Sequence, residues 1–467
     1  MNKNRLVANT LSGWSKTTHS ASKIYSPTNY QEIIEIFKSA LKDNFTISLL
    51  GGMRSYSDNF LNSEISIDMK HFNNVLALNE SQLLVQSGVT FYKIADFLED
   101  KKMMVEVIPG SGHVTIGGAI SNNIHGKNAY KSGFFGNHVI EITYIDLSNF
   151  KIKKCSRTID SKIFYSIISG LGVLGVVIEI LINLKKIDFP TVTENKIVVK
   201  DIDNLFNRIE EIEEYSDYLI ASIDLSSGLG NKSFAKLSYS KLTNIISKEK
   251  KTLNVFKILG SYKIIRPLFS FKPTYKLIEK LFGLYSSGFI SRKNGKINNV
   301  YKSHYLNDVF LPEYNYYFKD GFFEYQCNIP EKNAKKFYEY FVIELNKLNI
   351  KPLMTGLKSY SASKEKFLLS FQLEERSYGF TFDFPNLNTN ELKDLFTKLN
   401  NEVIKLNGKV YYAKSACLNF REFQLMYGKK NIENFRVLKR QLDPNSLLVN
   451  NLYRRIFLEE KTLINEY

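Results

Sequence analysis

Two glycine-rich stretches contain the residue types that could hold an anionic group against bare backbone. The first, "GGMRSYSDN" (51–59), follows the apolar run "ISLL", so a predicted strand ends in a loop of small side chains and donors. The second, "VIPGSGHVTIGGAISNNIHGKN" (107–128), adds further glycines, histidine and lysine. Glycine lets a pyrophosphate approach closely, and loop N–H groups can converge on its oxygens. The pair favours one extended phosphate-bearing cofactor held from two sides, with two ordinary glycine-rich connections as the alternative.

A third glycine pattern, "GLGVLG" (170–175), has the letters of a dinucleotide-binding fingerprint. That fingerprint requires a strand before it and a helix after it. Here the preceding "SKIFYSIISG" has the pattern of a helix, and the following "VVIEILINL" has the β-branched content of a strand. The reversed order predicts a tight helix-to-strand turn instead of a Rossmann nucleotide site.

Short strands and helices alternate in the first third of the chain. After about residue 184 the sequence changes: residues 190–310 are richer in Lys and Tyr, and 333–347 predicts an amphipathic helix between strands. This pattern indicates an α+β architecture in two parts. The predicted strands of the first part are "TISLLGG", "EISIDM", "QLLVQSGV" and "VIEITYIDL", and its helices are "YQEIIEIFKSALKDN" and "TFYKIADFLEDKKM", the latter with Thr90 as N-cap.

Composition limits the possible partners. The 467 residues carry 63 Lys and Arg against 47 Asp and Glu, a net charge of +16. This balance favours an anionic partner, which could be nucleic acid, a membrane surface or a phosphorylated substrate, or it reflects a lysine-rich composition with no partner. We find no zinc, RNP or helix-turn-helix pattern, so nucleic acid is not expected.

Cysteine usage and hydropathy indicate the compartment. The three cysteines are too few and too scattered for a disulfide framework or metal cluster, so we expect a reducing cytoplasm and no metal. The N-terminal residues lack the apolar core of a signal peptide, and no window approaches the length of a membrane span.

The three glycine stretches together resemble the FAD-binding domain of the vanillyl-alcohol-oxidase and p-cresol-methylhydroxylase family. Further stretches are similar to a member of that family that oxidises a lipid-linked pentose: "SGWSKTTHS", "GFFGNHV", "FFEYQCNIP", "FDFP", "VYYAKSACL" and "LKRQLDPNSLLVNNLYRR". The resemblance implies a two-part FAD-binding domain with an α+β substrate (cap) domain built on an antiparallel sheet. It divides the chain into 1–190 (FAD domain), 191–405 (cap domain, with a basic aromatic insertion near 255–303) and 406–467, which returns to the FAD domain.

The resemblance also implies how FAD is held. Many family members have, near the position of Tyr56, a histidine bonded covalently to the flavin, so a tyrosine there implies non-covalent FAD. The residues that the resemblance places at the cofactor are Gly51, Gly52, Met53, Arg54, Ser55, Tyr56, Asn59, Gly110, Thr115, Gly117, Gly118, His125, Gly126, Lys127, Asn128, Val176, Val177 and Tyr411.

Catalytic candidates follow from the same resemblance: Lys414, His125 and Lys127. Lys414 is either the base that takes a hydroxyl proton or a charge that stabilises reduced flavin, and both roles stay open. His125 either orients a neighbour beside the flavin or transfers a proton. Asp383 is expected to brace its strand. The implied substrate pocket contains Glu324, Tyr325, Gln326, Lys358 and Thr381; the family member has glutamine in place of Glu324 and cysteine in place of Thr381, so these departures bear on the substrate.

The expected activity is oxidation of the C2 hydroxyl of a polyprenyl-phosphoryl pentose to a ketone. A separate NAD(P)H-dependent reductase would complete an epimerisation. We expect a cytoplasmic protein peripheral to the membrane, because 255–303 mixes basic, aromatic and aliphatic residues that could meet a lipid surface. That stretch could instead be a surface insertion of ordinary amphipathic helices. The alternative functions are an aldonolactone or alditol oxidase acting on a soluble sugar, and a flavin-binding scaffold without turnover.

Overall fold

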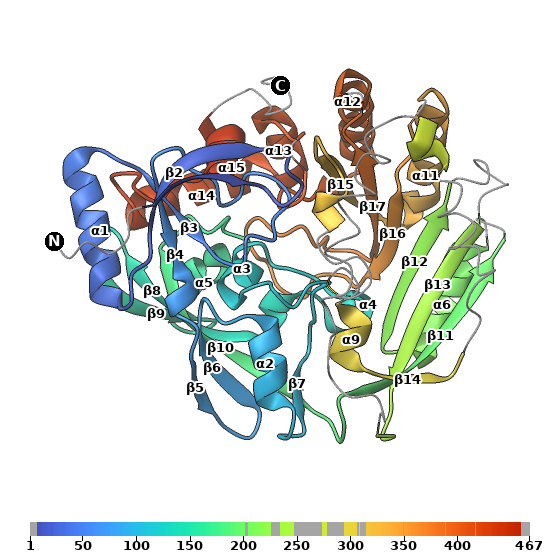
Figure 1. Ribbon diagram of the computed structural model, residues 1–467, viewed down its shortest axis with the longest axis horizontal. Helices are drawn as coiled ribbons and strands as arrows, with labels where there is room; N and C mark the ends of the chain where they lie inside the picture. Colours follow the sequence, from blue (N-terminus) through green and yellow to red (C-terminus); the bar gives the residue numbers. More distant parts are fainter. Residues whose placement is uncertain are drawn as a thin grey trace.

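The computed structural model describes residues 7–200, 204–225, 234–246, 273–277, 294–305, 308, 314–348, 350–387, 389–415 and 417–458 (Figure 1). Most of the predicted insertion at 255–303 therefore lies outside the described residues. Three β-sheets organise the described chain. Two belong to the N-terminal part, and the third is the large antiparallel sheet predicted for the cap domain, so the expected α+β fold is confirmed.

The first sheet ends at the loop that carries "GGMRSYSDN". Its strands β2, β4 and β3 are parallel, and β1 is antiparallel to β2. Helix α1 (Tyr30–Asp43) begins at Asn29, whose side chain accepts a hydrogen bond from the backbone N–H of Glu32, and buries an apolar face. The strands, in sheet order, are β1 (Val7–Ser12), β2 (His19–Tyr25), β4 (Ile65–Asp68) and β3 (Ile47–Leu50).

The second sheet supports the other two glycine stretches. Thr90 caps α2 (Phe91–Leu98) as predicted, and the 170–175 turn joins α5 (Ser161–Ile167) to β10, which confirms a helix-to-strand turn. Gly172 and Gly175 adopt positive φ there, +71° and +82°, which glycine allows without strain. The strands are β5 (Val75–Leu78), β6 (Gln82–Gln86), β10 (Val176–Lys186), β8 (Val139–Asp146), β9 (Lys151–Ser156) and β7 (Met103–Val105).

The third sheet has eight strands, all antiparallel, so alternate side chains point to opposite faces. Helices α6 (Leu205–Tyr215), α11 (Glu331–Asn346) and α12 (Thr389–Lys405) pack on one face, and α11 confirms the amphipathic helix predicted at 333–347. In sheet order the strands are β14 (Lys296–Asn299), β11 (Thr191–Val199), β13 (Phe234–Leu242), β12 (Tyr218–Asp224), β16 (Met354–Tyr360), β17 (Ser377–Pro385), β15 (Phe322–Pro330) and β18 (Lys409–Val410).

The C-terminal segment packs against the first sheet (Figure 1). Ile47 of β3 donates its N–H to the carbonyl of Leu447 at 2.6 Å and accepts from Val449 at 2.8 Å. The segment contains α13 (Phe420–Tyr427), α14 (Lys429–Leu442), α15 (Asn451–Tyr453) and a π-helix, η5 (Arg454–Leu458). The remaining short helices are η1 (Met69–His71), α3 (Ile116–Ser121), α4 (Ala129–Ser132), η2 (Phe135–His138), α9 (Val300–His304) and η4 (Tyr314–Tyr316).

Among the helices that the structure describes, none combines the length and apolar character needed to cross a membrane.

Candidate active site

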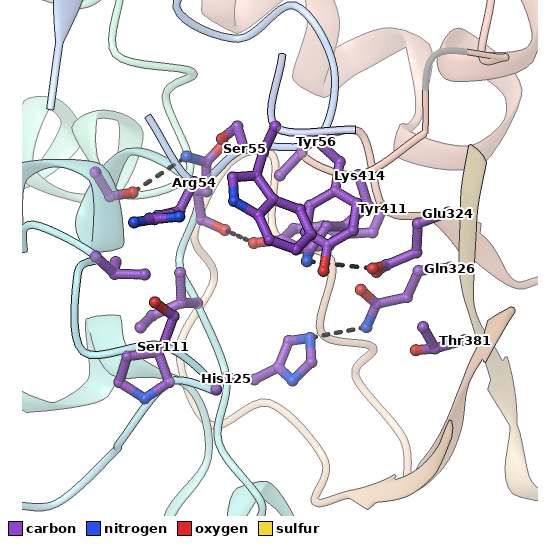
Figure 2. A pocket seen from close by; sticks show the side chains of 18 of the residues that line it. Arg54, Ser55, Tyr56, Ser111, His125, Glu324, Gln326, Thr381, Tyr411 and Lys414 are labelled. Carbon is purple, nitrogen blue, oxygen red and sulfur yellow. Dashed lines mark hydrogen bonds and ion pairs between the residues drawn. The ribbon is translucent and has the colours of Figure 1, made fainter. Parts of the chain in front are cut away.

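A cavity of about 630 Å³ lies between the loops of the first two sheets and the third sheet. It falls in the size range of small-molecule sites. Figure 2 shows its two walls: Arg54 and Ser111 on one side, and Glu324, Gln326 and Thr381 on the other. Segments far apart in the sequence, from the "GGMRSYSDN" loop to Lys414, therefore meet in one space.

The 52–56 loop has the features of an anion cradle. No hydrogen bond joins the backbone N–H groups of residues 52–56 to any other residue that the structure describes. Among the described residues, the buried Nε of Arg54 also lacks a partner. Gly110 faces this space, and a Cβ built there meets no atom within 4 Å. N–H groups without hydrogen-bond partners, next to backbone that no side chain covers, are suited to bind the pyrophosphate oxygens of FAD.

Gly52 makes room for the second glycine-rich loop and not for a phosphate. A Cβ at Gly52 would lie 2.1 Å from the carbonyl oxygen of His113, and one at Gly51 would lie 2.5 Å from Thr115 Oγ1. These glycines let the first loop pack directly against the second. The two loops are thus a single unit, and the absence of side chains at 51 and 52 sets their spacing.

Two glycine substitutions separate loop packing from cofactor contact. Gly52→Val is expected to lower both the thermal stability of the apoprotein and its FAD occupancy, because the side chain would collide with the second loop. Gly110→Val is expected to lower FAD occupancy while apoprotein stability stays near wild type, because only a ligand would occupy that space. Flavin absorbance per mole of purified protein and thermal unfolding of the apoproteins measure both effects. Full FAD occupancy in both variants would remove these loops from the cofactor site.

Tyr56 is fixed in an aromatic cluster beside Lys414. Its ring centroid lies 4.9 Å from that of Trp14 and 5.5 Å from that of Phe322. The Nζ of Lys414 lies 3.4 Å from the Tyr56 ring centroid. Burial, and then the charge of Glu324, raises the pKa of the Tyr56 hydroxyl well above its ordinary value. A buried, neutral phenol at this position leaves no imidazole to attach to a flavin.

The flavin is therefore expected to be released when the protein is denatured. Acid or heat treatment should leave a colourless precipitate and a yellow supernatant. The measurement is the flavin absorbance of the two fractions. Yellow colour retained in washed precipitate would reveal a covalent bond and contradict this account of Tyr56.

His125 lies in the cavity wall as a neutral imidazole. Its Nε2 is 3.0 Å from the amide nitrogen of Gln326, and the Tyr360 hydroxyl lies 3.4 Å away. Burial, and then the positive charges of Lys358 and Lys414, lowers the His125 pKa well below its ordinary value. His125 is thus placed to orient Gln326.

Two carboxyl groups and Lys414 form the polar centre of the third-sheet wall. Glu324 and Asp383 are direct cross-strand neighbours on β15 and β17, and Lys414 Nζ lies 3.4 Å from Glu324 Oε2. Burial, and then the charge of Glu324, raises the Asp383 pKa well above its ordinary value. The carboxyl group that forms the ion pair with Lys414 is that of Glu324. Asp383 also lines the cavity, and the expectation that it braces its strand stays a prediction.

Two further lysines of the predicted site lie nearby. Lys127 Nζ donates to the carbonyl of Ser303 at 2.7 Å. Burial lowers the pKa of Lys127 to about 8, and burial together with the charge of Lys414 lowers that of Lys358 to about 8.

Most of the predicted site residues line the cavity together. Three do not. Tyr325 faces α12, where its ring stacks on Phe396 and its hydroxyl donates to Asn400, because side chains alternate along β15. Its assignment to the substrate pocket is wrong. Val176 is fully buried at the start of β10, and the Asn128 amide donates to the carbonyl of Glu106, so neither contacts the cavity. The predicted residues that do line it are Gly51, Gly52, Met53, Arg54, Ser55, Tyr56, Asn59, Gly110, Thr115, Gly117, Gly118, His125, Gly126, Lys127, Val177, Glu324, Gln326, Lys358, Thr381, Tyr411 and Lys414.

Several residues that line the cavity were not predicted from the sequence. Trp14, Tyr314 and the polar residues of β11 to β13 line it as well. On β12 and the first half of β13 these residues alternate with buried apolar ones, a period-2 signal that marks one face of a sheet but does not show what packs against that face. On β11 the cavity residues Glu194, Asn195 and Lys196 are consecutive, and no such signal is present.

Comparison with known proteins agrees with this geometry. A family model described as an FAD binding domain matches residues 21–156, which hold both glycine-rich loops. The chain is an FAD-dependent oxidoreductase, and the predicted cofactor is confirmed as FAD. Along nearly its whole length it is similar to decaprenylphosphoryl-β-D-ribose oxidase of Mycolicibacterium smegmatis, with 25% identity over 96% of this chain and 97% of the relative.

Other relatives share only part of the chain. L-gulonolactone oxidase of Bos taurus is 24% identical over 43% of this chain and 46% of its own length. D-arabinono-1,4-lactone oxidase of Debaryomyces hansenii is 22% identical over 44% of this chain and 39% of its own length.

Proposed function

We propose that this enzyme oxidises the C2 hydroxyl of a polyprenyl-phosphoryl pentose to a ketone, the first half of an epimerisation. The observation that carries the proposal is that Lys414 and Gln326 face the cavity together with His125 of the second glycine-rich loop. Similarity to a decaprenylphosphoryl-ribose oxidase over 96% of the chain supports the same substrate class. A ketone formed at C2 requires a separate reductase to complete the epimerisation, and a nicotinamide cofactor is the usual hydride donor for such a step.

The protein's contribution is to position the alcohol and manage its proton. FAD, when bound, accepts a hydride from the alcohol carbon. Lys414 is paired with Glu324, so it offers a positive charge and not a lone pair. The ammonium can hold the hydroxyl oxygen as charge develops on it, and Glu324 supplies the anionic group through which the proton leaves. This arrangement favours the role of a fixed positive charge, which also stabilises reduced flavin, over that of a base for Lys414.

Gln326 and His125 position the sugar beside that ion pair. With one N–H of its amide directed at His125, Gln326 keeps its carbonyl oxygen for another donor, such as a second sugar hydroxyl. The rings of Phe134, Phe371 and Tyr411 lie within 5.0–6.0 Å of the His125 ring centroid and limit its movement. The neutral imidazole adds no charge of its own beside the Lys414 ammonium.

An enzyme that acts on a lipid-linked substrate must bind that substrate at a membrane surface. The net charge of +16 suits an anionic bilayer, and the segment 255–303 would supply basic and apolar side chains. We propose a peripheral enzyme at the cytoplasmic face, with no nucleic-acid partner.

The second candidate is an aldonolactone or alditol oxidase acting on a soluble sugar. The gulonolactone and arabinonolactone oxidases among the relatives favour it, although each covers under half of this chain. A flavin-binding scaffold without turnover is a third possibility, and the retained Lys414, His125 and Lys127 argue against it.

Anaerobic mixing of the holoenzyme with candidate substrates distinguishes the three. We expect farnesylphosphoryl-β-D-ribose to bleach the visible flavin absorbance and L-gulono-1,4-lactone to leave it unchanged. Bleaching by the lactone alone would establish the second candidate. No bleaching by either compound, in a protein with full FAD occupancy, would contradict the proposal.

A further inference from the structure

A group of lysines lines the cavity away from the Glu324–Lys414 pair. Lys127, Lys196, Lys236 and Lys358, which we call the basic subsite, come from four different segments. Lys196 and Lys236 were not among the predicted site residues. All four are only partly exposed and line the same cavity as Gln326.

Strand register places these lysines on one face of the third sheet. Lys196 of β11 pairs with Ser238 of β13, and Lys236 is two residues from Ser238, so both project to the same side. The next strands continue this face through Ile220 of β12 and Lys358 of β16, since Ser238 pairs with Ile220 and Ala221 with Leu357. The face runs on to Thr381 and Gln326.

Lys127 lies over the middle of this face. Its carbonyl accepts a hydrogen bond from the backbone N–H of Leu219 on β12 at 2.9 Å. Its side chain lines the same cavity as those of Lys196 and Lys358. Strands in a sheet are about 4.8 Å apart, which puts β11 and β16 about 14 Å apart with β12 and β13 between them. Extended lysine side chains can converge across that span onto one group.

The local charge is predominantly positive. Carboxylates that line the cavity from the same strands are Glu194 on β11 and Asp224 on β12, and the Glu194 side chain already accepts from Asn298. Burial is the main cause that lowers the Lys236 pKa, and the charge of Lys196 adds to it. Lysines that repel one another in a partly desolvated space are stabilised by a bound anion.

Uncharged donors lie in the same part of the cavity. The hydroxyls of Ser222, Ser238 and Ser240 line it from β12 and β13. His304, 1% exposed, also lines it, but its Nδ1 donates to the carbonyl of Val300, so the Nε2 of the neutral ring is not one of these donors. Hydroxyl groups beside several ammonium groups match the oxygens of a phosphate.

We propose that the basic subsite binds the phosphate of the substrate and thereby sets the sugar against Gln326 and Lys414. This inference rests on the proposed function, since a phosphate on the anomeric oxygen is only a short chain of bonds from C2. The anion is separate from the FAD pyrophosphate, for which the 52–56 loop on the opposite wall offers the donors. The shared chemistry is a phosphate ester, either the diester of a lipid-linked sugar or the monoester of a free sugar phosphate.

The test is the concentration dependence of anaerobic flavin bleaching in the holoenzyme. Its three probes are farnesylphosphoryl-β-D-ribose, β-D-ribose 1-phosphate and methyl β-D-ribofuranoside. Lys196→Gln is expected to raise the Kd of the phosphorylated probes about 10-fold, and Lys196→Gln/Lys236→Gln to raise it further. The limiting bleaching rate and the Kd of the methyl riboside should not change. The control Lys241→Gln removes an exposed lysine from the other face of β13 and should match wild type.

Each outcome decides the inference. Bleaching by both phosphorylated probes would mean that the phosphate suffices, and bleaching by the farnesyl compound alone would identify a lipid-linked source. An unchanged Kd for phosphorylated probes in the double variant, or an equal rise for the methyl riboside, would overturn the subsite.

A failed activity assay leaves the subsite testable. If no probe bleaches the wild-type flavin, the proposed function fails. Inorganic phosphate should still raise the unfolding temperature of the holoenzyme, and Lys196→Gln/Lys236→Gln should abolish that rise while Lys241→Gln retains it. No effect of phosphate on the wild type would overturn the subsite as well.

Discussion

Lys414→Met is expected to slow flavin reduction by farnesylphosphoryl-β-D-ribose by roughly 10²- to 10⁴-fold, with FAD content close to wild type. The ammonium contacts Glu324 and the Tyr56 ring, and its side chain is 25% exposed, so it adds little to core packing. Its loss removes a positioned charge at the reacting hydroxyl. The measurements are the rate of the reductive half-reaction against pH and the midpoint potential of the flavin.

The two roles of Lys414 give different results. Loss of a charge that favours reduced flavin lowers the midpoint potential and preserves the shape of the pH profile. Loss of a proton acceptor removes one limb of the profile and leaves the potential near wild type. The pairing with Glu324 predicts the first result. Near-normal rate and potential would take Lys414 out of the active site.

A second substitution provides the matched control for this experiment. Lys414→Met leaves Glu324, whose side chain is 5% exposed, without its cation beside the Asp383 carboxyl. Lys414→Met/Glu324→Gln removes both charges. If an unpaired carboxylate distorts the pocket of the single variant, the FAD content and unfolding temperature of that variant should fall, and both should recover in the double variant. We expect both variants to keep near-wild-type FAD content and unfolding temperature and to remain slow.

Arg455→Ala is expected to destabilise the protein by about 3–5 kcal/mol and to reduce FAD retention. Arg455 and Asp58 are almost completely buried and form two hydrogen bonds, of 2.8 and 3.0 Å. Asp58 lies two residues after the 52–56 loop, so this pair anchors the cofactor loop to the C-terminal segment. Urea unfolding and flavin absorbance per mole of protein measure the two effects.

Two controls test the cause of that loss. Arg440→Ala removes an exposed arginine from α14 and should cost less than about 1 kcal/mol. Asp58→Leu/Arg455→Met removes both charges and should be less destabilised than Arg455→Ala, because no carboxylate is left buried alone. A change under about 1 kcal/mol for Arg455→Ala would show that the pair does not anchor the loop.

The local pattern of the sequence was sufficient for some elements. Thr90 before an apolar period predicted the start of α2, and the β-branched run after Gly175 predicted β10. Both signals arise within a few residues, from capping and from strand propensity. The resemblance extended this to the FAD domain and to the antiparallel sheet of the cap.

Other features depend on contacts between distant segments. Tyr325 was assigned to the pocket through the family resemblance, but strand alternation turns it toward Asn400. Gly52 was predicted to make room for a phosphate, whereas the carbonyl of His113 occupies the position of its Cβ. Lys196 and Lys236 become neighbours only through the register of β11 and β13. Such pairings are set by the assembled sheet and are not encoded in any short stretch.

The central claim is that the hydrogen at C2 of a lipid-linked pentose reaches the flavin in this cavity. Farnesylphosphoryl-β-D-ribose carrying deuterium at C2 tests it most directly, in anaerobic stopped-flow bleaching of the holoenzyme. The account predicts that bleaching at saturating substrate is several-fold slower with deuterium at C2 and unchanged with deuterium at C3. Equal rates for all three isotopologues during rapid bleaching, or a slowing only with deuterium at C3, would contradict it.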